Sequence, residues 1–363
     1  MAYTTIDDPS AYFNTLLYSG NAGTNALTNS ANAGNFQPDW LWIRCRNSDV
    51  SHNVFDTSRQ TSGESTLVIR PNSTDAESNV SGDGMTSIDS NGFTLNGGGS
   101  GGGVNESGKT YVAWQWKANG GTTTSFSASS AQLAGTRQSN TTAGFSIITY
   151  TGDGNNNATI PHGLNSAPKW VVIKERGNAT NWYVGHDATF TTGEKFLNLE
   201  NATAAAFGPF NKTAPTASNI VLGTDGSVNG SSDTYVCYAF AEVQGYSKFG
   251  SYEGNGNADG AFVYTGFKPA FVIVKRTDSA NHWIILDSSR TDSSGGNSID
   301  RWIRVNTDAA EVNGSGVDFD FVSNGFKLRS ADNMTNNSSG SYIYMAFAEH
   351  PFVSSEGVPV TAR

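Results

Sequence analysis

One stretch of the chain carries the residue types and the spacing of a phosphate-binding loop. Residues 103–110, GVNESGKT, match the pattern G-x-x-x-x-G-K-[ST] in full. Phosphate binding by this pattern needs a strand before the loop and a helix after it, because backbone N–H groups and a helix N-terminus hold the phosphates. Here GGGSGG precedes the match, and an apolar strand-like run that begins at Tyr111 follows it. We therefore interpret the match as a turn and predict no nucleotide site.

An Asp-x-x-Arg motif occurs twice, each time after an apolar strand-like run. The two copies are DTSR at residues 56–59 and DSSR at residues 287–290. Such a pair either forms an internal ion pair that fixes the loop or faces a polar ligand such as a sugar. The similar surroundings of the two copies favour the structural role. If the protein binds a sugar, tryptophan rings would stack on it beside these polar groups. The candidate ligand-binding residues are Asp56, Arg59, Trp182, Trp283, Asp287 and Arg290.

Residues that support other kinds of catalysis do not occur at useful spacings. The five histidines include no H-x-x-x-H pair, and no G-x-S-x-G sequence lies between a strand and a helix. Asp318 and Asp320 offer oxygen ligands for Ca²⁺, but no twelve-residue loop pattern accompanies them, and we interpret them as a solvated acidic edge. We predict no catalytic residue, no metal site and no cofactor.

The composition excludes several classes of protein. The 363 residues include 41 Gly and 10 Pro, 15% are charged and 11% are aromatic. A coiled coil would need more Ala, Glu, Lys and Leu, and a disordered chain would hold fewer aromatic residues. The net charge of −10, with no cluster of Lys or Arg, argues against nucleic-acid binding. No apolar run approaches the length of a membrane span and no secretory signal begins the chain, so we expect folding in a cytoplasm without membrane insertion.

Three stretches of the chain share one order of features. Each has a Tyr-x-Gly sequence, then a Pro before an apolar run that ends in Lys or Arg, and then a closing run that begins with Tyr. The Tyr-x-Gly sequences begin at Tyr18, Tyr150 and Tyr252, the prolines are Pro38, Pro168 and Pro269, and the closing runs begin at Tyr111, Tyr235 and Tyr342. Self-similarity of this kind is typical of a repeat architecture. Large residues recur at every second position of the closing runs, which predicts half-buried strands.

The first and third stretches also share a hairpin signal. Both contain Ser-Asn-Gly-Phe, at residues 90–93 and 323–326. Asn-Gly between apolar runs favours a type I′ turn, since both residues tolerate positive φ. The second stretch has SNIVLG at residues 218–223 without this Gly, so we expect a different turn there.

These signals predict an all-β protein of three tandem repeats, each a small antiparallel β-sandwich. A single barrel or a propeller built from all three repeats remains open. The repeats would occupy residues 1–117, 144–245 and 246–363, the last with a C-terminal tail. Residues 118–143 are poor in apolar side chains, so we interpret them as a low-complexity linker or an exposed extension.

The repeat residues resemble a known group of proteins. GFKPAFVIVKRTD at residues 266–278, SNGFKL at 323–328 and YIYMAFAE at 342–349 are similar to sequences in repeat-containing virion proteins of marine tailed bacteriophages, as is the opening YTTIDDPSAYF at residues 3–13. The resemblance covers nearly the whole chain. It implies a tail-fibre or appendage protein with sandwiches of the concanavalin-like or jelly-roll type, located in the virion and assembled in the host cytoplasm. It supplies no catalytic residues.

We therefore hypothesise a non-enzymatic phage virion surface protein, a tail-fibre or appendage subunit involved in attachment to host-surface glycans. Its expected partners are other virion proteins, further copies of the chain, with a trimer favoured, and a host glycan. One alternative is a head-decoration or tail-scaffold subunit with a structural role. A second alternative is a polysaccharide depolymerase with paired carboxylates, for which Asp287, Asp318 and Asp320 are the candidates.

Overall fold

The computed structural model describes residues 3–29, 35–60, 67–80, 84–97, 103–202, 208–291, 297–314 and 316–360. In this part of the chain the regular structure is almost entirely β-strand, and the named strands pair antiparallel. The exceptions are a 3-10 helix, η1 (Pro9–Ala11), and one turn of α-helix, α1 (Gly226–Asn229). The predicted all-β class is confirmed. Neither of these two helices is long and apolar enough to cross a membrane.

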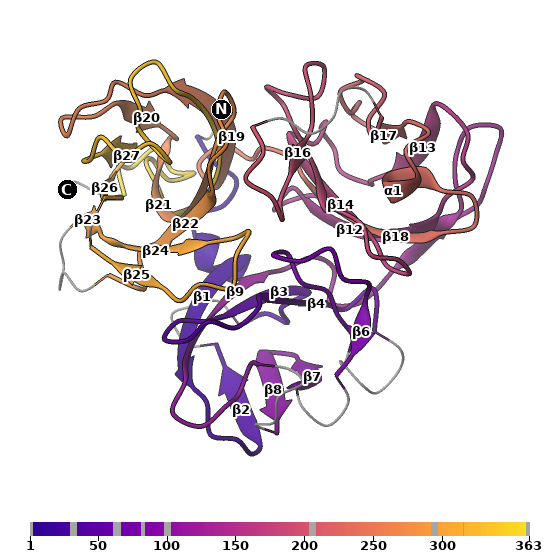
Figure 1. Ribbon diagram of the computed structural model, residues 1–363, viewed down its shortest axis with the longest axis horizontal. Helices are drawn as coiled ribbons and strands as arrows, with labels where there is room; N and C mark the ends of the chain where they lie inside the picture. The colour runs from indigo at the N-terminus through magenta and orange to yellow at the C-terminus, as the bar shows by residue number, and fades with distance from the viewer. Residues whose placement is uncertain are drawn as a thin grey trace.

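Three lobes surround a common centre, and each holds one large sheet near the centre with smaller sheets outside it (Figure 1). We call the lobes the first, second and third units in chain order. The large sheet of the first unit has the order β1 (Phe13–Ser19), β9 (Thr110–Trp116), β3 (Trp40–Cys45) and β4 (Asn53–Asp56). Its smaller sheets are β2 (Asn25–Thr28), β8 (Gly92–Asn96) and β7 (Gly84–Asp89), and the pair β5 (Leu67–Val68) and β6 (Ser78–Asn79).

The second unit has the widest sheet. Its order is β10 (Thr124–Phe126), β11 (Gly135–Asn140), β12 (Phe145–Thr151), β18 (Thr234–Phe240), β14 (Trp170–Glu175), β15 (Tyr183–His186) and β16 (Lys195–Phe196). The small sheet pairs β13 (Ala158–Pro161) with β17 (Asn219–Leu222). Strands β10 and β11 fall within residues 118–143, so the prediction of a linker there is wrong. Backbone hydrogen bonds to β12 hold β11 along its whole length, and such bonds do not require apolar side chains.

The third unit has a six-stranded large sheet. Its order is β19 (Ser247–Glu253), β28 (Ser341–Pro351), β21 (Phe267–Arg276), β22 (Trp283–Asp287), β24 (Arg301–Arg304) and β25 (Val312–Asn313). The small sheet has the order β20 (Phe262–Tyr264), β27 (Gly325–Leu328), β26 (Phe319–Val322) and β23 (Ser298–Ile299). In all three units, the predicted Pro-led run and the predicted closing run form adjacent strands of the large sheet.

The three large sheets pack against one another in a shared apolar cluster, which we call the central core. Phe13 and Trp116 of the first unit, Phe240 of the second unit and Phe347 of the third unit all belong to it and are at most 3% exposed. The ring centroid of Phe347 lies 5.4 Å from that of Phe13, 5.8 Å from that of Phe240 and 5.5 Å from that of Trp116. Each unit has a second core between its large sheet and its small sheets.

The large sheets are therefore buried on both faces. In β9, Val112, Trp114 and Trp116 belong to the central core, whereas Tyr111 and Ala113 belong to the core of the first unit. All six residues from 111 to 116 are buried, so the prediction of half-buried closing strands is wrong. Alternate side chains of the strand therefore enter two different apolar cores, and neither face of the sheet is exposed to solvent.

A stacked tyrosine pair closes each unit at the end of the large sheet. The pairs are Tyr18 with Tyr111, Tyr150 with Tyr235, and Tyr252 with Tyr342, each with ring centroids 5.0 Å apart. The first hydroxyl group of each pair donates a hydrogen bond to a backbone carbonyl oxygen of the loop before the closing strand. This contact explains why Tyr-x-Gly and the closing Tyr occur together in the sequence.

The two predicted hairpins are present, but their turn type differs from the prediction. Strands β7 and β8, and strands β26 and β27, form the hairpins. Asn91 and Asn324 do not have positive φ, so the turns are not type I′. The glycines begin the second strands instead: a Cβ on Gly92 would lie 2.0 Å from the carbonyl oxygen of Leu27, and Gly325 meets a neighbouring strand in the same way.

Replacing Phe347 with Ala should destabilise the whole molecule, because this ring contacts aromatic rings of all three units. The cavity and the lost apolar contacts should lower the free energy of unfolding by about 3–5 kcal/mol. Calorimetry should show one cooperative transition for the unmodified protein and a single shifted transition for Phe347→Ala, since no unit has an independent inner face.

The matched control is Phe262→Ala, since that ring is 48% exposed on β20 and should change stability much less. Separate transitions, of which Phe347→Ala shifts one alone, would show that the units unfold independently.

Candidate functional site

All six candidate ligand-binding residues are buried. The exposed fractions are 0% for Asp56, 3% for Arg59, 1% for Trp182, 0% for Trp283, 0% for Asp287 and 1% for Arg290. A sugar needs an accessible ring face or an accessible polar group. The expectation that these residues contact a ligand is therefore wrong. They join neighbouring units instead.

The Asp-x-x-Arg motif forms an internal ion pair in both copies, as the structural interpretation expected. Arg59 Nε lies 2.5 Å from Asp56 Oδ2, and this oxygen also accepts a hydrogen bond of 2.6 Å from the hydroxyl group of Tyr238 in the second unit. The copy at residues 287–290 has the same geometry, with the indole N–H of Trp114 in the first unit as the donor at 2.9 Å. Each aspartate thus links its own loop to the neighbouring unit.

A glutamate extends each ion pair into an Arg–Glu–Arg triad that crosses between units. The triads are Arg59–Glu77–Arg176 between the first and second units, and Arg290–Glu311–Arg46 between the third and first units. Their four N–O distances are 2.7, 2.7, 2.8 and 2.9 Å. Glu311 also pairs with Arg301 of its own unit at 2.9 Å. Burial would raise the pKa of Glu77 and of Glu311, but the flanking guanidinium groups hold both pKa values below the ordinary value. Both carboxylates are therefore ionised at neutral pH.

Trp182 and Trp283 make a second kind of contact between units. The indole N–H of Trp182 donates to the carbonyl oxygen of Arg70 at 3.0 Å, and that of Trp283 donates to the carbonyl oxygen of Phe196 at 2.8 Å. His52 has the same position in the strand register of the first unit, and its Nε2 lies 2.9 Å from a carbonyl oxygen of the third unit. The first unit thus contacts the third, the second contacts the first, and the third contacts the second.

The interface between the second and third units lacks a triad. In the strand register, Thr189 and Thr277 have the positions of the two arginines. In the other two interfaces, the glutamate follows by three residues a carbonyl group that accepts a hydrogen bond from Lys174 or Arg44 of the next unit. Here the carbonyl group belongs to Glu200 and accepts from Lys275, so the equivalent residue is Thr203, which lies outside the described residues. His186 replaces the aspartate, and Met345 replaces the donor from the neighbouring unit. Burial lowers the pKa of His186 to about 4, so this imidazole is neutral at pH 7.

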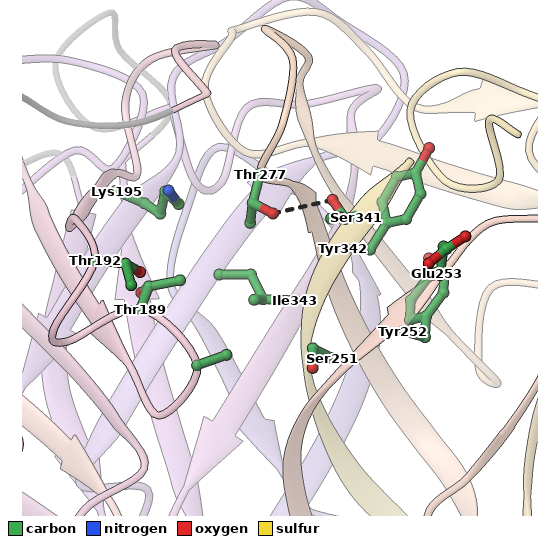
Figure 2. Close-up of a pocket in the computed structure, with 11 residues that line it drawn as sticks. Thr189, Thr192, Lys195, Ser251, Tyr252, Glu253, Thr277, Ser341, Tyr342 and Ile343 are labelled. Atoms are coloured by element: carbon green, nitrogen blue, oxygen red, sulfur yellow. Dashed lines mark hydrogen bonds between the residues drawn. The ribbon is translucent and has the colours of Figure 1, made fainter. Parts of the chain in front are cut away.

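A pocket of about 570 Å³ occurs at this interface. Figure 2 shows Thr189, Thr192 and Lys195 of the second unit on one side of it, and Ser251, Tyr252, Glu253 and Tyr342 of the third unit on the other. Five of the lining residues carry aliphatic hydroxyl groups, namely Thr189, Thr192, Ser251, Thr277 and Ser341. The volume lies within the range of about 300–1,000 Å³ that is usual for small-ligand sites.

Lys195 is the cation of the pocket. The residue is 3% exposed, and no hydrogen-bond acceptor or carboxylate oxygen among the described residues lies within bonding distance of Nζ. The adjacent Glu194 turns one oxygen toward the backbone N–H of Phe210, at 3.4 Å. Burial lowers the pKa of Lys195 to about 8, against the opposing charge of Glu194, so the amine is mostly protonated at neutral pH.

Sequence reasoning missed Lys195, although a partial signal existed. Residues 186–189 read HDAT where the other units have DTSR and DSSR. Thr189 stands where the other units have Arg59 and Arg290, and this difference identifies the interface between the second and third units as the one without this ion pair. Lys195 itself belongs to no motif, so its isolation becomes visible when the sheets are assembled.

The other chemical signals in the sequence have structural explanations. Residues 103–110 lead directly into β9, as predicted, and Lys109 Nζ contacts Ser48 Oγ at 2.6 Å. Asp320 pairs with Arg329 at 3.0 Å, whereas the buried Asp287 is inaccessible to a polysaccharide. Among the described residues, no group of three or more His, Cys, Asp and Glu side chains could hold a metal ion.

Replacing Glu311 with Gln should destabilise the protein, because the carboxylate, with 4% of its side chain exposed, is the shared partner of Arg290 and Arg46. We expect denaturant titration to show a loss of about 3–5 kcal/mol in the free energy of unfolding. The exposed Glu356→Gln is the matched control and should change it by about 0.5 kcal/mol or less.

The triads also predict an acid-dependent loss of stability. The pKa values of Glu77 and Glu311 lie below the value of 4.5 in the unfolded chain, so the unfolded state binds more protons as the pH falls. The free energy of unfolding should therefore decrease below pH 4.5, and Glu311→Gln should reduce that dependence. An equally steep dependence in the variant would contradict this role of Glu311.

Comparison with known proteins places the chain in a family. A family model with the description "Domain of unknown function (DUF7483)" matches residues 8–351. No curated protein matches the chain at a significant level, and no solved structure does so. The matched residues extend from the residue before η1 to the end of β28, and they include the large sheets of all three units. The chain therefore belongs to the DUF7483 family.

Proposed function

We propose that the three units are tandem repeats of one β-sandwich of the concanavalin-like or jelly-roll type. The strand register supports this proposal. An aromatic residue of each Pro-led strand pairs with an aromatic residue of the closing strand at the same place in the register. The pairs are Trp40 with Trp116, Trp170 with Phe240, and Phe271 with Phe347. The three stacked tyrosine pairs, with equal centroid distances, give further support.

We also propose that the chain is a non-enzymatic virion surface protein, a tail-fibre or appendage subunit that binds a glycan of the host surface. The pocket between the second and third units carries the binding part of this proposal. The resemblance to phage virion proteins supports the location. Other virion proteins and further copies of the chain, in a trimer, are its proposed partners.

The chemistry of the pocket suits a polyhydroxylated ligand. Serine and threonine hydroxyl groups both donate and accept hydrogen bonds, as sugar hydroxyl groups do. Thr192, Ser251 and Ser341 are exposed at the rim, so a ligand can reach them from solvent. Tyr252 and Tyr342 also line the pocket, but they stack on each other and Tyr342 is 1% exposed, so the hydroxyl groups at the rim are the accessible contacts.

One surface feature favours the alternative of a structural virion subunit. Phe262 and Tyr264 point outward from β20, and they are 48% and 53% exposed. The hydroxyl group of Tyr264 lies 3.2 Å from that of Tyr3, so this patch adjoins the N-terminal segment. Exposed aromatic side chains at a sheet edge are typical of protein contacts, and the patch would hold the subunit to another virion protein.

Blocking the pocket should abolish glycan binding if the proposal is correct. Ser251 is exposed on the rim, so Ser251→Trp should fill the opening without disturbing either core. We expect the unmodified protein to bind purified host-surface polysaccharide in biolayer interferometry, and the variant to bind about tenfold more weakly or worse.

Ser125→Trp provides the matched control, because Ser125 is exposed on β10, at the opposite edge of the sheet from β16. Its binding should equal that of the unmodified protein. Equal binding by both variants would place any glycan contact elsewhere, and no binding by the unmodified protein would reject attachment.

A further inference from the structure

We propose that the pocket between the second and third units binds the carboxylate of an acidic sugar, with Lys195 as the counter-ion. This inference rests on the proposed glycan-binding function and names the class of its ligand. Its support comes from a comparison of the three interfaces within the one chain.

The other two interfaces each place a mostly buried carboxylate between arginines of the two units. Glu77 and Glu311 fill this role, with N–O distances of 2.7 to 2.9 Å to the flanking arginines. In the second unit, residues 201–207, which follow Glu200 in the sequence, read NATAAAF and contain no acidic residue. The chain therefore supplies no carboxylate of its own from that stretch.

A cation nevertheless remains at the third interface. Lys195 is 3% exposed, lines the pocket and has no hydrogen-bond or ion-pair partner among the described residues. Burial of the side chain disfavours its charge, and a carboxylate from a ligand would stabilise the charged form. Lys195 has the strand position of Ile69 and Ile303 in the other units, so it is an additional cation and does not replace a triad arginine. A carboxylate pairs with the triad arginines at the other interfaces, and the same group would pair with this ammonium group.

Among the charged groups near Lys195, the carboxylate of Glu194 opposes the effect of burial on its pKa, so the charge of Lys195 is partly compensated. Lys275 lies on β21 of the third unit, and the charge of Lys195 adds to the effect of burial in lowering the pKa of Lys275. Its Nζ donates to the carbonyl oxygens of Glu200 and Asn281. Glu253 is exposed at the opposite rim, and the carboxyl group of Glu194 faces Phe210. The pocket wall thus presents the ammonium group of Lys195, and its rim is polar.

The remaining lining favours a sugar acid over a peptide carboxylate. Five hydroxyl-bearing side chains surround the pocket, and the hydroxyl group of Thr277 donates to the carbonyl oxygen of Ser341, so its own oxygen is directed to accept from a ligand. A uronic acid carries several hydroxyl groups next to one carboxylate on a rigid ring. Such a ligand can use the ammonium group and the hydroxyl groups together at low entropic cost.

The direct test compares two sugars that differ at one carbon. Methyl α-galacturonoside has a carboxylate where methyl α-galactoside has a hydroxymethyl group. Ligand-observed NMR titration of the full chain should give a dissociation constant about tenfold lower, or better, for the galacturonoside. Lys195→Gln should remove this preference, and Lys195→Arg should retain most of it.

A second pair of variants avoids a change at a buried site. Thr192 lines the pocket and is exposed, so Thr192→Glu places a carboxylate beside Lys195 without burying it in a core. We expect Thr192→Glu to weaken galacturonoside binding about tenfold, as an internal competitor, whereas the neutral Thr192→Gln keeps it. Thermal unfolding of each variant confirms that the fold is intact.

The outcomes separate this inference from the proposed function. Equal binding of the two sugars would overturn the carboxylate inference and leave glycan binding in place. Tighter binding of N-acetylglutamate amide than of the galacturonoside would overturn it in favour of a peptide ligand. Binding of neither sugar would also overturn it, whereas attachment itself is decided by the polysaccharide assay with Ser251→Trp.

Discussion

The need to bury the inner faces of three sheets in one apolar core shapes the whole molecule. Because Phe13, Trp116, Phe240 and Phe347 meet at the centre, each large sheet loses its solvent-exposed face. Polar groups at the edge of this core must then find partners in a neighbouring unit. The indole–carbonyl contacts, the hydrogen bonds from Tyr238 and Trp114 to the aspartates of the Asp-x-x-Arg pairs, and the triads meet this requirement, and each of them crosses an interface.

The same requirement explains why one interface differs. At two interfaces a glutamate pairs with arginines of both units, and an ion network of this kind gives specificity of docking more than net stability. The third interface has threonine at positions 189 and 277, histidine at 186 and methionine at 345, so it is held by apolar packing and carbonyl contacts. The space that a triad would fill becomes a pocket, and Lys195 remains inside it.

The positions of most strands could be predicted from the sequence, but the burial of their two faces could not. Strong apolar runs after Pro38, Pro168 and Pro269 formed strands because β-branched and aromatic residues dominate them. The alternation of large and small side chains in residues 111–116 does not distinguish an exposed face from a second apolar core, so the central core could not be predicted from the sequence. Strand β11 escaped detection because backbone pairing with β12 holds it.

The candidate site was harder to predict for a related reason. Trp182 and Asp287 have the residue types of a sugar-binding site, but their burial depends on contacts with units more than 80 residues away in sequence. Lys195 has no local motif, and its isolation follows from what is missing around it. Lys195 is recognised as a candidate binding residue when the three interfaces between units are compared.

The arrangement of three unlike units in one polypeptide has a consequence for valency. A ring of three identical subunits must repeat every interface, so it carries three copies of a pocket or none. Here covalent linkage frees each interface to change separately, and the chain carries the triads at two interfaces and this pocket at the third. In the proposed attachment role each polypeptide would be monovalent through this pocket, and the strength of multivalent adhesion would depend on how many copies a particle displays and how far apart they stand.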